Sequence, residues 1–452
     1  MGTVQLWGLG RCPLWIVLCA TVTVAVTLGV AVLTLKFMVV VVPRPAGGDF
    51  RVFYTAGYLL RHGQDPYGAA HLTAVMGRVT PPGGPSVPSP FLYVPWFALL
   101  MVPLSLLPFW AAYGLLDVLM LGVLAISTYQ WARALGWRFP GGAAAVVALS
   151  TIAFINYDLG QVAILSMGFL VAFLLAVDGG RLDWAGALAM AGALLLPQDL
   201  WPLVPLLWVL PRPWRWATFR RGLLGEAIAA LALLGTPLLM RADLLGQWIH
   251  RLLHFGATLP FQGELVGLPG LTAFAPARWN LAPGLRDPAV GAVAMVGVAV
   301  AAAVTVVLLR SPKLSRLRRP RSTGWLVLLP LGIWLLVTPY GHIQDLAAIF
   351  PLAMLALGTR AADLRRPRAW LLLMSLLAVP VALTFFTPYL FPQETVAPLG
   401  LLVLVSVAGL ELRRELAEAR LGAAAASDWV AAGSAASRFA CPPQPPITKR
   451  HD

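Results

Sequence analysis

Long, uninterrupted apolar runs dominate the chain and are separated by short polar segments. A first run covers residues 13–42, and further runs lie near 109–131, 140–156, 161–178, 184–209, 222–241, 289–310, 324–340, 345–360, 369–387 and 395–410. About 20 apolar residues are enough for an α-helix to cross a bilayer. A transmembrane β-barrel is excluded, because its strands alternate polar and apolar positions over about 10 residues. The pattern therefore predicts an all-α polytopic membrane protein, a bundle of about 10–12 transmembrane helices.

Composition agrees with this prediction. Of the 452 residues, 59% are hydrophobic and 12% are charged, whereas a soluble domain averages roughly 45–50% apolar and about 25% charged residues. A soluble globular enzyme, a disordered protein and a coiled coil are thereby excluded. The net charge of +14 comes from basic residues in the loops between apolar runs. Such residues set membrane orientation, so no nucleic-acid partner is expected. The three cysteines, Cys12, Cys19 and Cys441, imply no disulfide framework.

Basic clusters mark the cytoplasmic side of the predicted bundle. They lie at 212–221, 310–321 and 360–368, and the positive-inside rule assigns all three to the cytoplasm. The run 13–42 is longer than a signal-peptide core and is interpreted as a retained anchor, with Arg11 on the cytoplasmic side. Both termini are then cytoplasmic, and the expected location is the plasma membrane.

Two long external segments follow from this orientation. The first covers 43–108 and is expected to carry short interfacial helices, and the second covers 242–288. A short external turn lies at 338–345. Residues 1–410 form one predicted transmembrane domain. Residues 411–452 are predicted to be a cytoplasmic tail that starts as a short charged helix and continues disordered, because Ala, Ser and Pro dominate it.

The run 184–209 conflicts with a single crossing. Arg181 precedes it and the cluster 212–221 follows it, and both look cytoplasmic. Pro197 lies in the middle, in LLLPQDLWP, where it interrupts a helix. The sequence predicts two short half-helices that form a hairpin turning within the membrane, where irregular backbone must line a cavity or pack in protein. A kinked single span with one misassigned loop remains the alternative.

Polar and aromatic side chains gather in the first external segment, in GGDFRVFYTAGYLLRHGQDPYG at 47–68. Asp49 precedes a stretch with helical character, 50–61, whose apolar residues can share one face. Gly63 ends it, and Asp65 begins an Asp-Pro-Tyr turn. Asp49 is either a functional carboxylate or a helix N-cap. Asp65 is either functional or a turn residue, and 50–61 is also compatible with an amphipathic helix on the membrane surface.

The motif Asp-Phe-x-x-x-Tyr-x-Ala-Gly, followed by Gly-x-Asp-Pro-Tyr, resembles the first external loop of glycosyltransferase family 87. These are GT-C-type membrane enzymes that use polyprenyl-phosphate sugars, and they include mannosyl- and arabinofuranosyltransferases. Further stretches are similar to that family in the same order: PFLYVPWFALLMVPLSLLP (90–108), LGQVAILSMGFLVAFLLA (159–176) and TPYGHIQDLAAIFPLAML (338–355). The resemblance implies a GT-C-like bundle and a hexosyl- or pentosyltransferase activity.

The resemblance also implies roles for particular residues. Asp49 would be the general base on the acceptor hydroxyl, which attacks C1 of the lipid-linked sugar with inversion. The donor would be a polyprenyl-phosphate sugar, with mannose as a family-level guess, and the acceptor a lipid or glycan of the cell envelope. The candidate substrate-binding residues are Arg51, Tyr54, Arg61, His62, Asp65, Tyr157, Gln161, His342 and Asp345. His342 is the preferred contact of the phosphate or acceptor, and Asp345 either orients His342 or caps the following helix.

The chain departs from the family pattern at two positions. Leu196 stands where the family commonly has a lysine before the proline, and Ala163 stands where asparagine is frequent. Gln198 or an external arginine would then contact the lipid phosphate. No Asp-x-Asp or Glu-x-Asp pair occurs in the external segments, so neither a metal nor another cofactor is expected.

Two other classes of protein remain as alternatives. Asp117, Asp199 and Glu226 are acids within apolar runs, which is also typical of a secondary transporter or lipid flippase. A non-catalytic scaffold of envelope assembly is the third hypothesis. The long, aromatic-rich external segments and the lack of a visible internal repeat favour the glycosyltransferase.

Overall fold

The computed structural model describes residues 3–6, 10–13, 48–81, 90–137, 140–148, 150–210, 216–253, 268, 286–311, 314, 317, 320–338, 343–357 and 401–418. Helices account for nearly all of these residues, as the apolar runs predict. The exception is a two-stranded antiparallel hairpin of β1 (Thr3–Leu6) and β2 (Gly10–Pro13). The anchor predicted at 13–42, the run at 369–387 and the tail beyond 418 lie outside the described residues.

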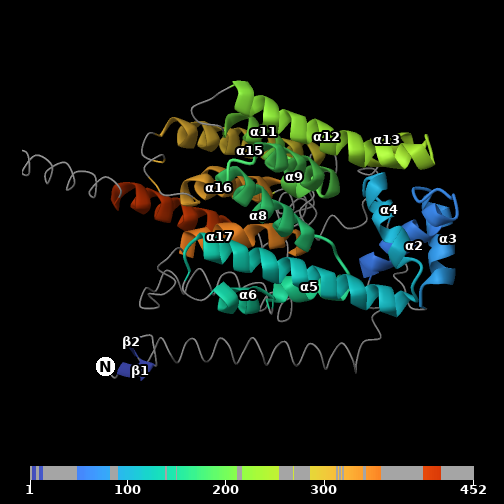
Figure 1. Cartoon of the computed structure of the whole chain (residues 1–452), viewed down its shortest axis with the longest axis horizontal. Helices are drawn as coiled ribbons and strands as arrows, with labels where there is room; N and C mark the ends of the chain where they lie inside the picture. The colour runs from blue at the N-terminus through green and yellow to red at the C-terminus, as the bar shows by residue number, and fades with distance from the viewer. Residues whose placement is uncertain are drawn as a thin grey trace, which may run out of the picture.

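The described helices have the following bounds. In chain order they are α2 (Gly48–Arg61), α3 (Ala69–Val79), α4 (Pro95–Leu104), α5 (Phe109–Ala134), α6 (Pro140–Ala148), α7 (Thr151–Leu159), α8 (Ile164–Asp178), α9 (Leu182–Leu195), α10 (Pro197–Leu200), α11 (Leu203–Val209), α12 (Trp216–Met240), α13 (Leu244–Leu253), α15 (Arg286–Arg310), α16 (Arg321–Val337), the 3₁₀ helix η5 (Ile343–Ile349) and α17 (Phe350–Leu357). A further helix covers 401–418. The long helices run lengthwise through the bundle, and α2, α3 and α4 gather at one end (Figure 1).

Helices of membrane-spanning length are present. α5 and α12 are each long and apolar enough to cross a bilayer, and several shorter apolar helices accompany them. Large apolar side chains cover their outer faces: Leu231 is 77% exposed and Leu239 is 90% exposed on α12, and Val118 is 66% exposed on α5. Apolar surface of this extent is rare on a soluble monomer. These helices are consistent with a membrane protein.

The predicted interruption at Pro197 is confirmed. α9 ends at Leu195, and the chain continues as the short helices α10 and α11. Leu200 lies against Gly192 near the end of α9, whereas Leu207 lies against Gly222, beside Leu182 at the start of α9. The chain therefore reverses direction after α9, and α11 runs back along α9. α9 and α11 are the two arms of this hairpin. The location of the turn within a membrane stays a prediction.

The run 140–156 is also divided, which the sequence reasoning did not anticipate. α6 and α7 meet at Ser150, whose hydroxyl accepts a hydrogen bond from the Ala153 amide at 3.3 Å. Such a side-chain acceptor satisfies an amide at the start of a helix and so marks a new N-terminus. α7 consequently runs as a separate helix toward the segment that carries Gln161.

α9 and α12 cross with their backbones in contact. A Cβ atom added to Gly186 would overlap the carbonyl of Gly222, and one added to Gly225 would overlap the carbonyl of Asp183. Small residues permit this approach, which strengthens dispersion contacts where lipid removes the hydrophobic driving force between helices. Next to the crossing, Arg221 pairs with Asp183 at 3.1 Å.

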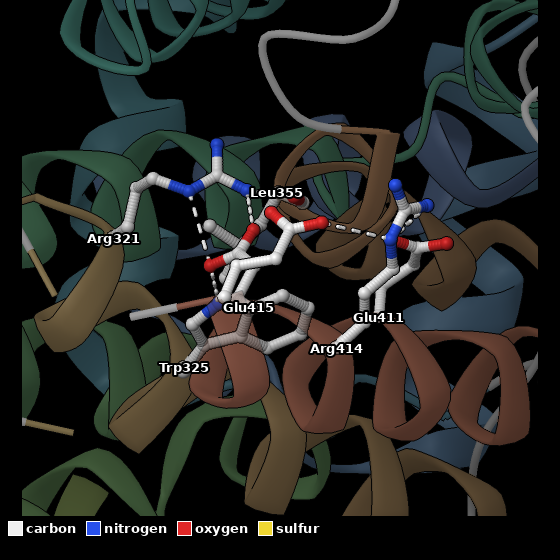
Figure 2. Close-up of polar contacts among 7 residues, drawn as sticks. Arg321, Trp325, Leu355, Glu411, Arg414 and Glu415 are labelled. Atoms are coloured by element: carbon white, nitrogen blue, oxygen red, sulfur yellow. Dashed lines mark hydrogen bonds and ion pairs between the residues drawn. The ribbon is translucent and has the colours of Figure 1, made fainter. Parts of the chain in front are cut away.

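The helix 401–418 packs on α16 and α17. Leu401, Leu404, Ala408 and Leu412 form its buried stripe, with the spacing of one helix face. The carboxylate of Glu415 accepts hydrogen bonds from the guanidinium of Arg321 and from the indole of Trp325, the latter at 3.0 Å (Figure 2). Arg321 also donates to the carbonyl of Leu355 at 3.2 Å. The helix continues without a break through 411, where the tail was predicted to begin.

The α9–α12 crossing yields a stability prediction. Gly225→Ala is expected to lower the free energy of unfolding by about 1–3 kcal/mol, because the new methyl group forces two backbones apart. The matched control is Gly235→Ala on the same helix, where nothing lies within 4 Å of the added Cβ. Thermal unfolding in detergent should separate the two variants, and equal stability would contradict the described crossing.

A second prediction concerns the charge pair at the C-terminal helix. Glu415→Gln is expected to lower the free energy of unfolding by about 1–3 kcal/mol, between the values for exposed and fully buried pairs. The pair is largely buried, so the variant would leave the positive charge of Arg321 away from solvent and without its carboxylate partner. Glu418→Gln removes an exposed acid of the same helix and serves as the control. Unchanged thermal unfolding of Glu415→Gln would show that the pair is dispensable.

Candidate active site

α2 carries the first residue of the candidate site, and other segments of the chain bury nearly all of its faces. The predicted face of Phe50, Phe53, Tyr54, Gly57 and Leu60 is buried, as are most of the other residues of the helix. A Cβ atom on Gly57 would lie 2.5 Å from the backbone of α4, so the two helices touch there. α2 is therefore an inner helix of the fold and does not lie freely on the surface as an amphipathic helix.

Asp49 lies in the first turn of α2 and is held by Gln161. The side-chain amide of Gln161 donates a hydrogen bond to Oδ2 of Asp49. The contact depends on Gly160, which ends α7 with a φ of +63° and lies so close to α2 that a Cβ atom there would be 2.5 Å from Cβ of Phe50. Glycine is the residue that adopts this conformation without strain. The next residue, Gln161, is thereby brought to Asp49.

Tyr93 completes a hydrogen-bond chain with these two residues. Its hydroxyl donates to Oε1 of Gln161 at 3.3 Å, and its ring packs edge-on against Phe53 with centroids 4.9 Å apart. Burial raises the pKa of Tyr93 well above its ordinary value, and the charges of Asp49, Asp345 and Asp199 raise it further. The hydroxyl therefore keeps its proton at neutral pH and remains a donor.

Two more carboxyl groups belong to this neighbourhood. Asp345 lies in the first turn of η5 and is 4% exposed, and Asp199 lies in α10 and is 0% exposed. Both act electrostatically on Tyr93. Acids from three distant parts of the sequence thus act electrostatically on one tyrosine. Within the described ranges, no group of three or more histidines, cysteines, aspartates or glutamates is arranged to hold a metal ion.

The Gly-x-Asp-Pro-Tyr motif positions Tyr93. The carboxylate of Asp65 accepts a hydrogen bond from the backbone amide of Tyr67 at 2.8 Å, as expected of a turn residue. The turn directs the hydroxyl of Tyr67 to the carbonyl of Tyr93, again at 2.8 Å. From the other side, the indole of Trp248 in α13 donates to the carbonyl of Leu92 at 2.9 Å.

The predicted cations of the first external segment lie elsewhere. Arg51 is 1% exposed, donates to the hydroxyl of Thr80 at 3.1 Å and stacks on Phe109. Burial lowers the pKa of Arg51. Arg61 donates to the carbonyl of Ser105 at 2.9 Å. Both side chains connect α2 to neighbouring segments, and neither is joined to the Asp49 group by a described contact.

The remaining predicted residues are distributed around the site. Tyr54 donates its hydroxyl to the carbonyl of Leu107 at 2.8 Å. His62 is exposed and bonds to the carbonyl of Tyr58. Tyr157 is half-buried one turn before Gln161, and its carbonyl accepts a hydrogen bond from Tyr113. His342 lies outside the described residues.

Sequence reasoning missed Tyr93 and assigned Asp199 only to the transport hypothesis. Tyr93 lies in the quoted stretch PFLYVPWF, but a tyrosine among apolar residues carries no signal of its own. An acid two residues after a helix-breaking proline was the available signal for Asp199. Of the other acids of that hypothesis, Glu226 accepts a hydrogen bond from Trp208 at 2.9 Å, and Asp117 is half-buried on α5.

The sequence that carries most of this site matches the model of a known protein family. The family model of glycosyltransferase family 87 matches residues 91–339, more than half of the chain. The chain belongs to glycosyltransferase family 87, and this membership supports glycosyltransferase activity. The matched region includes Tyr93, Gln161 and Asp199, and Asp49 and Asp345 flank it. No curated protein and no solved structure was found to match the chain.

The hydrogen-bond chain predicts a role for Gln161 in sugar transfer. Gln161→Met is expected to lower the transfer rate about 10-fold or more, since a hydrogen bond to a charged group contributes roughly 1.5–3 kcal/mol. The acid limb of the pH–rate profile should move to higher pH, because a carboxylate that loses a donor is protonated more easily. Gln247→Met, on α13, is the control. An unshifted pH profile would mean that Gln161 does not act through Asp49.

Proposed function

We propose that the protein is an integral-membrane glycosyltransferase that moves a sugar from a polyprenyl-phosphate donor to a glycolipid or glycan of the cell envelope, with inversion. A mannose-like sugar is the proposed donor group. The family membership supports the reaction class, and the apolar outer helices support the membrane location. The single observation that carries the assignment of the site is the carboxylate of Asp49, fixed by Gln161 at the start of α2.

Asp49 is the proposed general base. The acceptor hydroxyl gives its proton to the carboxylate while its oxygen forms a bond to C1 of the donor sugar. The bond between C1 and the phosphate oxygen breaks, and polyprenyl phosphate leaves with the electron pair. A carboxylate within hydrogen-bond reach can take such a proton as the nucleophile forms. Gln161 orients Asp49 through one carboxylate oxygen, and Tyr93 orients Gln161.

The leaving phosphate needs hydrogen-bond donors or a cation. Arg51 and Arg61 are engaged with Thr80 and with the carbonyl of Ser105, which makes them structural in this proposal. His342 then contacts the phosphate or the acceptor. It precedes Asp345 by three residues, and Asp345 belongs to the group around Tyr93.

The proposed orientation places the site on the external side, with both termini in the cytoplasm. The reversal between α9 and α11, together with the pair of Arg221 and Asp183 at 3.1 Å, keeps the basic residues before α9 and after α11 on one side. α12 then runs for 25 residues, about 37 Å, which exceeds the hydrocarbon thickness. At its far end, Arg241 donates to the carbonyl of Gly63 at 3.2 Å, next to α2 (Figure 1).

The experiment that tests this function is replacement of the base. Asp49→Asn is expected to lower sugar transfer from polyprenyl-phosphate mannose about 100- to 10,000-fold, because the amide cannot accept the proton. The matched control is Asp65→Asn in the same external segment, where the amide oxygen can still accept the turn hydrogen bond from Tyr67.

Transfer should be measured with purified protein in liposomes, together with a thermal unfolding curve for each variant. Full activity of Asp49→Asn would reject the base assignment. Substrate-dependent ion flux in the same liposomes, without sugar transfer, would favour the transporter hypothesis.

A further inference from the structure

Asp199 is a fully buried carboxyl group whose hydrogen-bonding capacity is unused. Its side chain is 0% exposed, and neither Oδ1 nor Oδ2 has a hydrogen-bond partner among the described residues. A buried polar group left without a partner costs free energy, and a charged one costs more. Native proteins therefore retain such a group where something else provides the missing donors.

Helix capping does not account for Asp199. An acid in the first turn of a helix often accepts hydrogen bonds from free amides there. The amide of Asp199 instead donates to the carbonyl of Leu196 at 3.0 Å, and no side chain caps the start of α10. Glu226, which is also buried, differs in that its Oε2 accepts a hydrogen bond from Trp208 and only Oε1 lacks a partner in the described part of the chain, whereas Asp199 has no partner there on either oxygen.

α10, which carries Asp199, and η5, which carries Asp345, both pack against α8, the helix that follows Gln161. Asp199 interacts electrostatically with Asp345 and with Tyr93. Tyr93 already donates its hydroxyl hydrogen to Gln161, so it does not serve Asp199. The unpartnered oxygens thus lie in the neighbourhood of the Asp49–Gln161–Tyr93 chain, on a segment of interrupted helix.

We propose that Asp199 accepts hydrogen bonds from ring hydroxyls of a sugar bound beside Tyr93, and so determines which sugar is used. This inference rests on the proposed function. A carboxylate offers two oxygens with about four lone-pair positions, and neighbouring hydroxyls of a sugar ring are neutral donors that can use both oxygens. A bound cation is the less suitable occupant, because no group of three metal-ligating side chains forms here in the described part of the chain.

The sugar could come from the donor or from the acceptor, and deoxy analogues distinguish the two. The probes are polyprenyl-phosphate mannose and octyl mannoside, each with single hydroxyls removed. Asp199→Asn is expected to lower kcat/KM with the complete sugars about 10- to 100-fold. The kcat/KM of wild type should fall by a similar factor with the one analogue that lacks the hydroxyl bound by Asp199. Because Asp199→Asn has already lost this contact, its kcat/KM should fall little further with the same analogue. The series in which this occurs identifies the sugar.

A binding role and a structural role for Asp199 predict opposite changes of Tm when Asp199 is replaced. A structural role predicts a lower Tm, and a binding role predicts a higher one. In the absence of substrate, Asp199→Asn and Asp199→Leu are expected to raise Tm, since each removes a buried ionisable group whose oxygens have no hydrogen-bond partner within the described ranges. Both should reduce the rise in Tm that polyprenyl-phosphate mannose produces in wild type. Asp183→Asn, which removes an exposed acid at the start of α9, is the control for general charge effects.

Any of three results would overturn the inference. The first is a lower Tm of both variants without substrate, and the second is an equal loss of kcat/KM by wild type and Asp199→Asn on every analogue. The third is sugar transfer that chelators abolish and a divalent cation restores. The proposed function fails separately, if wild type transfers no sugar from the lipid-phosphate donor or if Asp49→Asn remains active. Active wild type, inactive Asp49→Asn and an unaffected Asp199→Asn would reject only the inference about Asp199.

Discussion

The hydrogen-bond chain from Tyr93 through Gln161 to Asp49 is the interaction on which the site depends. Each link joins a different part of the fold: the segment before α4, the connection between α7 and α8, and the first turn of α2. Buried aromatic rings such as those of Phe50 and Phe53 lie beside the hydrogen-bond chain, and an apolar environment makes polar contacts stronger when they are made and costlier when they are lost. The position of one carboxylate is therefore fixed by three segments that are held together by apolar contacts.

Close backbone contact makes this chain possible. Gly160 allows the α7–α8 connection to touch α2, and Gly57 allows α4 to touch the same helix. Gly186, Gly222 and Gly225 do the same for α9 and α12. In lipid, where apolar side chains gain little by leaving their solvent, such contacts are a main source of stability between helices. The glycines that stabilise the bundle and the glycine that aligns the site thus act by one physical mechanism.

Much of the fold was predictable from the sequence, because it follows from local patterns. The apolar runs predicted the helices, Pro197 predicted the interruption after α9, and Gly63 predicted the end of α2. The site was predictable only in part. Asp49 was found by motif, but Tyr93 acts through contacts across 68 positions of sequence. Arg51 looked like a phosphate ligand because the sequence does not reveal that Thr80 takes up its donor. Long-range contacts of this kind are decided by packing, which periodicity does not encode.

The bond between Arg321 and Glu415 links positions 94 residues apart. During synthesis, Arg321 is made well before its carboxylate partner, so its guanidinium lacks this counter-charge until Glu415 follows. The helix 401–418 supplies that counter-charge only after these further residues have been synthesised. Packing of this helix on α16 must therefore follow synthesis of Glu415, and a product that stops short of Glu415 leaves Arg321 without this counter-charge.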